Sequence, residues 1–329
     1  MTDSSHRRAA AHKRSVHHEM GERSDATRAS GLRVLLAHDL SPAAARATAL
    51  IAGTTWPRAT VVRVVSSPLG IGPGLSSFAM LSDARTHAKQ VQATIALAHE
   101  RVAAELLDAG VSVETRIVHG RPERALIADA ERFDADLIVV GARGHGPLTA
   151  TLLGSVSRAV IETAPCSVLV ARGGAVSRVL LATDGSAPAR LATTIAASWP
   201  LFAGVRTLVV GVGGAPPGYA GLVIAEAEWR EAFPRNIADS VARSSMVVDA
   251  AVEELATPRR TIEREIRLGD VGTEIVAAAR AWAADLVAIG AYGEPFLRRL
   301  ILGSVARKVL DGARSSVLVA RPRRMTDDD

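Results

Sequence analysis

Two stretches of this chain decide its fold because each repeats the other. Residues 153–172 read LGSVSRAVIETAPCSVLVAR and residues 302–321 read LGSVARKVLDGARSSVLVAR, with 13 of 20 aligned positions identical. An earlier pair repeats in the same order, since VLLAHDLS at residues 34–41 returns as VLLATDGS at residues 179–186. The offsets, 149 and 145 residues, are nearly equal, and self-similarity at a fixed period indicates duplicated structural units. We therefore predict two tandem domains, at residues 31–173 and 177–321.

Within each half, strand-like and helix-like segments alternate. In the first half we expect strands at residues 33–37, 60–65, 111–118, 137–140 and 167–171, and helices at residues 42–52, 83–109, 122–133 and 155–163. The second half repeats this order, with a variable insert at about residues 213–259. This alternation predicts an α/β fold in which each domain is a doubly wound, Rossmann-like parallel sheet. Ligands of such sheets bind beyond the carboxyl ends of the strands, where the strand order reverses.

Composition narrows the classes of function. The net charge is +5, but 36 of the 39 basic residues are arginines spread along the chain, and aromatic residues make up only 3%. Because single-strand binders combine basic charge with stacking rings, we expect no nucleic-acid partner. No apolar run approaches the roughly 20 residues that span a bilayer, so we expect no membrane association and a cytoplasmic location.

Cys166 is the only cysteine, so no intramolecular disulfide is expected, in keeping with a reducing compartment. It precedes an apolar run, which favours a buried small hydrophobe over a reactive thiol. Residues 1–30 and 322–329 show no periodicity, and we expect them to be disordered tails.

The motif that carries chemistry is a glycine loop after the fourth strand of each half. The first copy reads GARG at residues 141–144 and, after nine further residues, Gly154-Ser155; the second reads GAYG at residues 290–293 and, after the same gap, Gly303-Ser304. Glycines let backbone N–H groups approach an anion closely, and a helix N-terminus offers unpaired donors to phosphate. Ser155 can either cap its helix or donate to a phosphate oxygen. A tight turn followed by a cap would explain one copy, but the identical gap in both favours phosphate binding.

Asp39 and Asp184 end the first strand of each half and precede a serine and a helix. A helix N-cap is the simplest interpretation, since Asp caps well. The alternative is a carboxylate that binds ribose hydroxyls, as an acidic residue does in dinucleotide-binding folds. We expect the ends of the first and fourth strands to meet at one crevice, which favours the ribose interpretation.

These residues resemble the universal stress protein family, whose ATP-binding members carry Gly-x2-Gly-x9-Gly-Ser/Thr and an Asp after the first strand. The GRP turn at residues 120–122 and the APCSVLV run at residues 164–170 are also similar to that family. The resemblance covers about 290 residues, in both halves. It implies two domains of the adenine nucleotide alpha hydrolase-like type.

The resemblance also implies two ATP sites. Adenine would lie near Ala37, His38 and Val64 in the first site, and near Ala182, Thr183 and Val212 in the second. Ribose would meet Asp39 and Gly141, or Asp184 and Gly290. Phosphates would lie on Gly144, Gly154, Ser155 and Val156, or on Gly293, Gly303, Ser304 and Val305, and Gly120 and Arg143 would complete the first site. Mg²⁺ would be held mainly by phosphate oxygens and water, and the resemblance implies no catalytic residue and no protein metal ligand.

The two sites differ at a few positions. Leu40 stands where the second half has Gly185, so the turn after Asp39 is expected to be stiffer. In the second half Tyr292 replaces Arg143, and Glu294 follows Gly293. Because a carboxylate repels a triphosphate and a guanidinium attracts it, we expect the first domain to bind ATP more tightly.

The expected function is that of an ATP-binding stress or growth regulator that acts through an unidentified protein partner, with at most weak ATP hydrolysis. A slow ATPase or autophosphorylating enzyme and a nucleotide-free interaction module are the alternatives. The two domains are expected to form an internal pseudo-dimer through their last strands, at residues 168–170 and 317–319, because apolar edge strands otherwise invite aggregation. Whether two copies form a homodimer is left open by the sequence.

Overall fold

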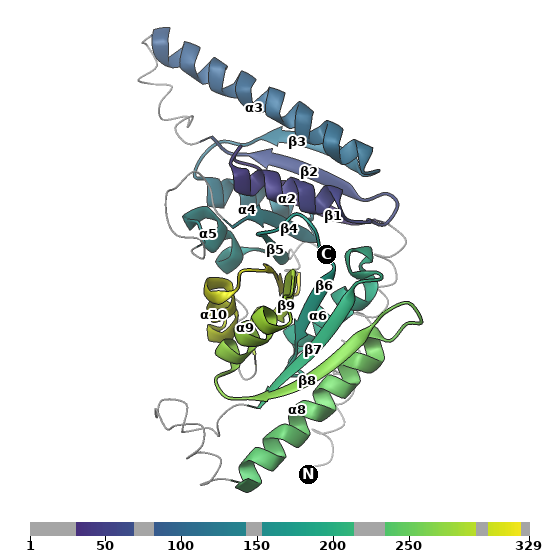
Figure 1. Cartoon of the computed structure of the whole chain (residues 1–329). Coiled ribbons are helices and arrows are strands. Elements are labelled where there is room, and N and C mark those ends of the chain that lie inside the picture. The colour runs from purple at the N-terminus through teal and green to yellow at the C-terminus, as the bar shows by residue number, and fades with distance from the viewer. Residues whose placement is uncertain (1–30, 69–81, 143–152, 214–233, 294–301, 324–329) are drawn as a thin grey trace, which may run out of the picture.

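The computed structural model of this chain describes residues 31–68, 82–142, 153–213, 234–293 and 302–323. The described residues form one ten-stranded sheet with the order β3-β2-β1-β4-β5-β10-β9-β6-β7-β8 (Figure 1). All neighbours run parallel except β5 and β10. The predicted α/β fold with parallel sheets is thereby confirmed.

The elements follow the predicted order in both halves. The strands are β1 (Arg33–Ala37), β2 (Val61–Ser66), β3 (Ser112–Ile117), β4 (Leu137–Gly141), β5 (Ser167–Ala171), β6 (Arg178–Ala182), β7 (Arg206–Gly213), β8 (Ile262–Leu268), β9 (Leu286–Gly290) and β10 (Ser316–Ala320). The helices are α2 (Pro42–Ala52), α3 (Ser82–Asp108), α4 (Pro122–Phe133), α5 (Ser155–Thr163), α6 (Ala187–Ser198), α8 (Pro234–Leu255), α9 (Val271–Ala281) and α10 (Ser304–Gly312), with a short 3-10 helix η1 (Pro200–Phe202). Strand β3 is one residue shorter at each end than predicted, β2 begins and ends one residue later, and α3 begins and ends one residue earlier.

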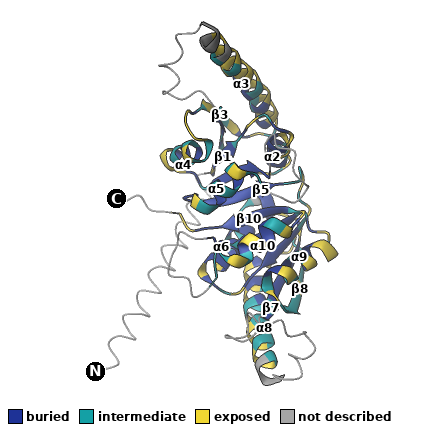
Figure 2. Cartoon of the chain, turned by 90° about the vertical axis from the view of Figure 1, so that its left-hand side faces the viewer, coloured by how far each residue is buried: buried dark blue, intermediate teal, exposed yellow. Residues whose placement is uncertain are grey.

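Two layers of helices cover the sheet because strand residues alternate between its faces. Val34 and Leu36 belong to the hydrophobic cluster on the face covered by α2, α3, α6 and α8, whereas Leu35 belongs to the cluster on the face covered by α4, α5, α9 and α10. Figure 2 shows the buried strands between these layers, with the exposed surface of α3 and α8 at opposite ends. No described helix is both long and apolar enough to cross a membrane.

The two halves join through their last strands, as predicted. β5 and β10 pair antiparallel with Val168 opposite Val319, Leu169 opposite Leu318 and Val170 opposite Val317. Every residue of both strands is buried. Two apolar edges thus become the centre of one continuous sheet, which removes the exposed backbone that an edge would present.

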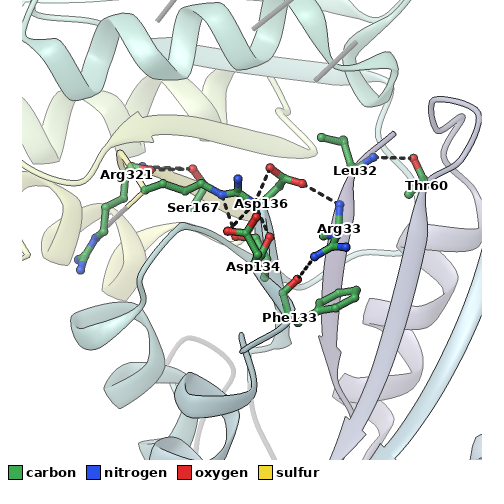
Figure 3. Close-up of polar contacts among 10 residues, drawn as sticks. Leu32, Arg33, Thr60, Phe133, Asp134, Asp136, Ser167 and Arg321 are labelled. Carbon is green, nitrogen blue, oxygen red and sulfur yellow. Dashed lines mark hydrogen bonds and ion pairs between the residues drawn. The ribbon is translucent and has the colours of Figure 1, made fainter. Parts of the chain in front are cut away.

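Two arginines, one from each half, stabilise this junction by hydrogen bonds to the opposite half. Arg321, which follows β10, donates to the carbonyls of Ile161 (3.0 Å), Glu162 (3.3 Å) and Ala164 (3.2 Å) at the end of α5. Its own N–H donates to Ser167 Oγ at 3.2 Å (Figure 3). A guanidinium suits the unpaired carbonyls and negative dipole end of a helix C-terminus. Each half therefore ends in a contact with the other.

The first half mirrors this contact. Arg172 donates to the carbonyl of Leu310 at the end of α10 (2.6 Å) and to that of Ser315 (3.1 Å). Ion pairs cross the junction in the same reciprocal way, from Arg158 to Asp311 (2.8 Å) and from Arg307 to Glu162 (4.0 Å). We call Arg172 and Arg321 the reciprocal arginines.

Cys166 lies in this core and is 1% exposed. Burial raises the pKa of its thiol to about 12, so the thiolate, which is the reactive form, is scarce at neutral pH. The prediction of a buried hydrophobe is confirmed.

Candidate functional site

The strand order reverses once in each half, and the candidate sites lie at those points. β1 pairs with β2 on one side and β4 on the other, and β6 likewise pairs with β7 and β9. The ends of the first and fourth strands are therefore neighbours, as expected. Such a reversal opens a crevice at the carboxyl ends of the strands.

The two aspartates at this crevice do not cap the helices that follow them. Ser41 and Ser186 are the N-caps, and each Oγ accepts from the N–H three residues later (3.2 and 3.4 Å). Asp39 and Asp184 are exposed, and each Oδ1 accepts from the serine N–H two residues later (3.0 and 2.9 Å). This turn fixes the backbone that carries each carboxylate. The N-cap interpretation of these aspartates is thus wrong, while their contact with ribose stays a prediction.

The second-site aspartate approaches the glycine loop. A Cβ on Gly293 would lie 2.9 Å from Asp184 Oδ2, so the last glycine of the GAYG run lies against the carboxylate that ends β6. Tyr292 and Gly293 are half-buried. Arg143, Gly144 and Glu294 lie outside the described residues.

The first glycine of each loop has a packing role. A Cβ on Gly141 would lie 2.7 Å from the backbone carbon of Ala43 in α2, and a Cβ on Gly290 would lie 2.8 Å from the backbone nitrogen of Ala189 in α6. Real Cβ atoms cannot approach backbone this closely, so glycine is required where β4 and β9 pass these helices. We expected these glycines to let the backbone approach an anion. At Gly141 and Gly290 the structure shows instead that the neighbouring helix leaves no room for a side chain. Their contact with ribose remains a prediction.

Helices α5 and α10 begin at the expected phosphate positions. Gly154 and Gly303 are their N-caps with the same backbone angles, φ −64° and ψ 155°, and neither helix has a side-chain cap among the described residues. Helices α2, α6 and α9 are capped by the side chains of Ser41, Ser186 and Asp270. Uncapped N–H donors at α5 and α10 are what an anion needs.

Ser155 and Ser304 are the first residues inside these helices and are exposed. The idea that Ser155 caps its helix is therefore wrong, and its hydroxyl stays a predicted phosphate donor. Val156 and Val305 are half-buried and pack against the core. Their backbone N–H groups, rather than their side chains, are what each helix turn presents.

At the expected adenine end, the proposed contacts differ in burial. Ala37 and Val212 are half-buried, whereas Ala182, His38 and Thr183 are 6–7% exposed. Val64 is fully buried and pairs with Leu36, one residue before the end of β1. The register of β6 and β7 makes Val209 the counterpart of Val64, so Val64 and Val212 are not equivalent positions.

Gly120 follows β3 and is exposed, with φ at +114°. This left-handed backbone favours glycine at the turn before α4. Its counterpart Gly269 has φ at +137°, so the turn itself accounts for both glycines, and contact of Gly120 with a ligand remains a prediction.

A buried polar cluster in the first site was missed from the sequence. Ser66 Oγ donates to the His38 carbonyl (2.5 Å) and lies 2.8 Å from His99 Nε2. His99 is 3% exposed. Burial and, to a smaller extent, the neighbouring His38 lower the pKa of His99 to about 4. Burial also lowers the pKa of His38, although Asp39 opposes that shift.

Both imidazoles are therefore neutral at pH 7. Because the Ser66 hydrogen points to the His38 carbonyl, its oxygen accepts from His99 Nε2–H. The helical spacing of Ile95, His99, Val102 and Leu106, all buried, would have identified His99 as inward-facing. We call His38, Ser66 and His99 the histidine cluster.

Among the described residues, no group of three or more His, Cys, Asp or Glu side chains gathers in a position to hold a metal ion. The crevices offer backbone N–H donors and one carboxylate each. This chemistry suits a polyanion that carries hydroxyl groups, with any Mg²⁺ held through the phosphates.

Comparison with known proteins agrees with the duplicated fold. The model of the "Universal stress protein family" matches residues 32–172 and again residues 175–321. A universal stress protein of Mycobacterium tuberculosis is 28% identical over 249 residues, which cover 69% of this chain and 74% of that protein.

Solved structures give the same fold. A universal stress protein from Archaeoglobus fulgidus superposes with a TM-score of 0.57 and 18% identity, over 88% of this chain and 98% of that one. A universal stress protein family protein from Arabidopsis thaliana was solved with AMP bound; it is 20% identical over 42% of this chain and 88% of its own, with a TM-score of 0.31. That TM-score is too low to place its ligand on this chain.

Proposed function

This chain belongs to the universal stress protein family, and we propose that it is a cytoplasmic, ATP-binding regulator that acts through a protein partner. One ATP would bind at each crevice, with phosphates on the first turn of α5 or α10. Ribose would meet Asp39 or Asp184. Mg²⁺ would be held by the phosphates, and hydrolysis would be weak at most.

One observation carries this proposal. The helices that start at the predicted phosphate positions, α5 and α10, lack a side-chain cap within the described part of the chain, while α2, α6 and α9 have one. Helix α4 also lacks one, but it follows the edge strand β3 and not a reversal of strand order. A helix start left with unpaired donors costs stability unless water or a ligand satisfies them. Both occur at the reversal of strand order, where an anion would also meet an exposed aspartate.

A charge placed at the start of each helix tests the proposal. Ser155→Asp and Ser304→Asp put a carboxylate on the first turn, where it favours the helix dipole but repels phosphate. We expect each to lower Mg-ATP affinity at its own site by about tenfold or more, since tenfold is about 1.4 kcal/mol. Ala187→Asp, at the exposed first residue of the capped helix α6, is the matched control.

Isothermal titration calorimetry and thermal shift are the measurements. No heat and no shift with millimolar Mg-ATP would overturn the proposal, and unchanged affinity in both serine variants would overturn the phosphate placement. Comparing Gly144→Ala with Gly293→Ala tests whether the first site is tighter, because equal losses contradict it. Time-dependent release of ADP would favour the ATPase alternative.

A further inference from the structure

The first domain carries an arginine-rich groove that shares only Gly120 with the predicted nucleotide sites. It lies between the edge strand β3 and helix α4, in the half of the molecule that ends in α3 (Figure 1). Its volume is about 590 Å³. Arginines come from both walls: the basic lining residues are Arg116, His119, Arg121, Arg124 and Arg132, which we call the arginine groove. None of the described residues that line it carries a carboxylate.

A buried carboxylate positions part of the groove. Asp129 is fully buried beneath it, with Oδ1 3.2 Å from Arg116 Nη1 and 3.8 Å from Arg132 Nη2. Its Oδ2 lies 3.7 Å from Arg63 Nη1, and Arg63 also stacks on Phe133, 3.9 Å from the ring centre. Arg63 also pairs with Glu114 at 2.6 Å. Asp129 is then the one carboxylate that pairs with Arg116 and Arg132 among the described residues, and it orients both without neutralising both.

The remaining two arginines differ in their ion pairs. Arg121 pairs with Glu123 (2.7 Å), and Arg124 is exposed with no ion pair among the described residues. Fixed guanidinium forks that keep spare N–H donors suit carboxylates or phosphates, which they bind in a bidentate manner. The groove therefore has the chemistry of an anion-binding surface.

The second domain shows that the fold does not require these arginines. At the places of Arg116, Arg121, Arg124 and Arg132 it has Glu265, Asp270, Thr273 and Ala281. Its charges there pair with one another: Arg267 binds both Glu265 and Glu274 (2.9 Å each), and Lys308 binds Asp270 (2.7 Å). The equivalent strand and helix of the second domain thus fold with their charges paired with one another. Excess positive charge at this place is a property of the first domain alone.

We propose that the arginine groove binds an extended acidic segment of a partner polypeptide. This inference deepens the proposed function, on which it rests for the expectation of a protein partner. The arginines span α4, whose 12 residues extend about 18 Å at 1.5 Å per residue. A single compact phosphate would reach only part of this length, whereas five or six extended residues cover it at about 3.3 Å each.

Two further features favour a polypeptide over a nucleic acid. No aromatic side chain is among the described lining residues, so bases have no ring to stack on. One wall is β3, which pairs only with β2 among the described strands and exposes Glu114, Thr115 and Arg116. An extended peptide can hydrogen-bond along such an edge and direct alternate side chains toward the arginines.

Fluorescence polarisation with a labelled Asp/Glu octapeptide tests the proposal on the full chain. The double variant Arg121→Asp with Arg124→Thr gives the first domain the residues of the second and leaves the Asp129 contacts intact. We expect at least about tenfold weaker peptide binding, since rim charges steer association and each contributes modestly. Arg259→Thr, at an exposed arginine elsewhere, should change the affinity less than about twofold.

Other outcomes overturn the proposal. They are a peptide that does not bind, equal affinity in the double variant, or tighter binding of tripolyphosphate, or of an oligothymidylate matched in charge to the peptide, than of the peptide. The thermal shift with Mg-ATP is measured on the same samples. Peptide binding without a nucleotide shift would contradict the nucleotide proposal and leave the groove intact, and the reverse result would contradict the groove alone.

Discussion

The two expected adenine positions have the same backbone elements but different side chains. The first contains the histidine cluster, His38, Ser66 and His99; the corresponding positions of the second are Thr183, Gly211 and Val248. A Cβ on Gly211 would lie 2.7 Å from Val248 Cγ2, so valine fills the space that a serine side chain would occupy. The two halves thus have the same strands and helix at this place, with polar side chains in the first half and mainly apolar residues in the second.

At the junction between the halves, in contrast, the equivalent side chains are the same. Arg172 and Arg321 occupy equivalent positions and each binds the end of the other half's last helix. A two-fold contact must satisfy both halves at once, so a change in one copy leaves carbonyls of the other without a donor. Symmetry is retained where the halves share an interface, and lost where each works alone.

The largest expected effect concerns the reciprocal arginines. Arg321 is 4% exposed, whereas Arg172 is half-buried. Arg321→Ala leaves three carbonyls of α5 without their donor and should lower the free energy of unfolding by about 4 kcal/mol, against about 2 kcal/mol for Arg172→Ala. Urea denaturation measures both, with Arg259→Ala as the exposed control. Equal losses would show that burial does not distinguish the two copies.

The second effect concerns the histidine cluster, whose Ser66 and His99 are replaced by the residues of the second half. The pKa of His99 is about 4 in the folded chain and about 6.5 when unfolded. As pH falls from 6.5 to 4, the unfolded chain therefore binds the proton first and stability is lost, by at most about 3 kcal/mol. Ser66→Gly with His99→Val should remove this part of the pH dependence.

Urea midpoints at pH 7 and pH 4.5 provide the measurement. His119→Gln, which removes an exposed histidine, serves as the control and should keep the wild-type slope. A double variant that loses as much stability on acidification as the wild type would exclude His99 as the source.

The smallest effect concerns the turn after the first strand. Leu40 has φ at +65° and its counterpart Gly185 has φ at +75°, a region that costs a non-glycine residue about 1–2 kcal/mol. Gly185→Leu should lower stability by about that amount, since its Cβ would also lie 3.0 Å from Val247. Leu40→Gly should change stability by less, because relief of strain opposes the flexibility that glycine adds to the unfolded chain. Thermal unfolding of the two variants compares the turns, and a larger effect of Leu40→Gly would contradict the argument.

The turn also shows how sequence reasoning performed. Because Leu40 stands where the second half has Gly185, the sequence predicted a stiffer turn. The structure shows that both residues have a left-handed backbone, which a leucine adopts less readily than a glycine. The spacing identified the glycines of the loops, but it did not reveal why Gly141 has to be a glycine. Gly141 is glycine because Ala43 lies against it, a contact between residues nearly a hundred positions apart.

The sequence by itself determined the two domains, the order of their elements, the pairing of β5 with β10 and the burial of Cys166. These follow from repeats and from periodicity, which are local properties of a chain. Only the tertiary structure decided that the reciprocal arginines bind the opposite half, that Asp129 gathers three arginines, and that Ser66 joins two histidines. Such contacts depend on where distant segments come to lie and on which side chains point inward together, and no spacing along the chain encodes that.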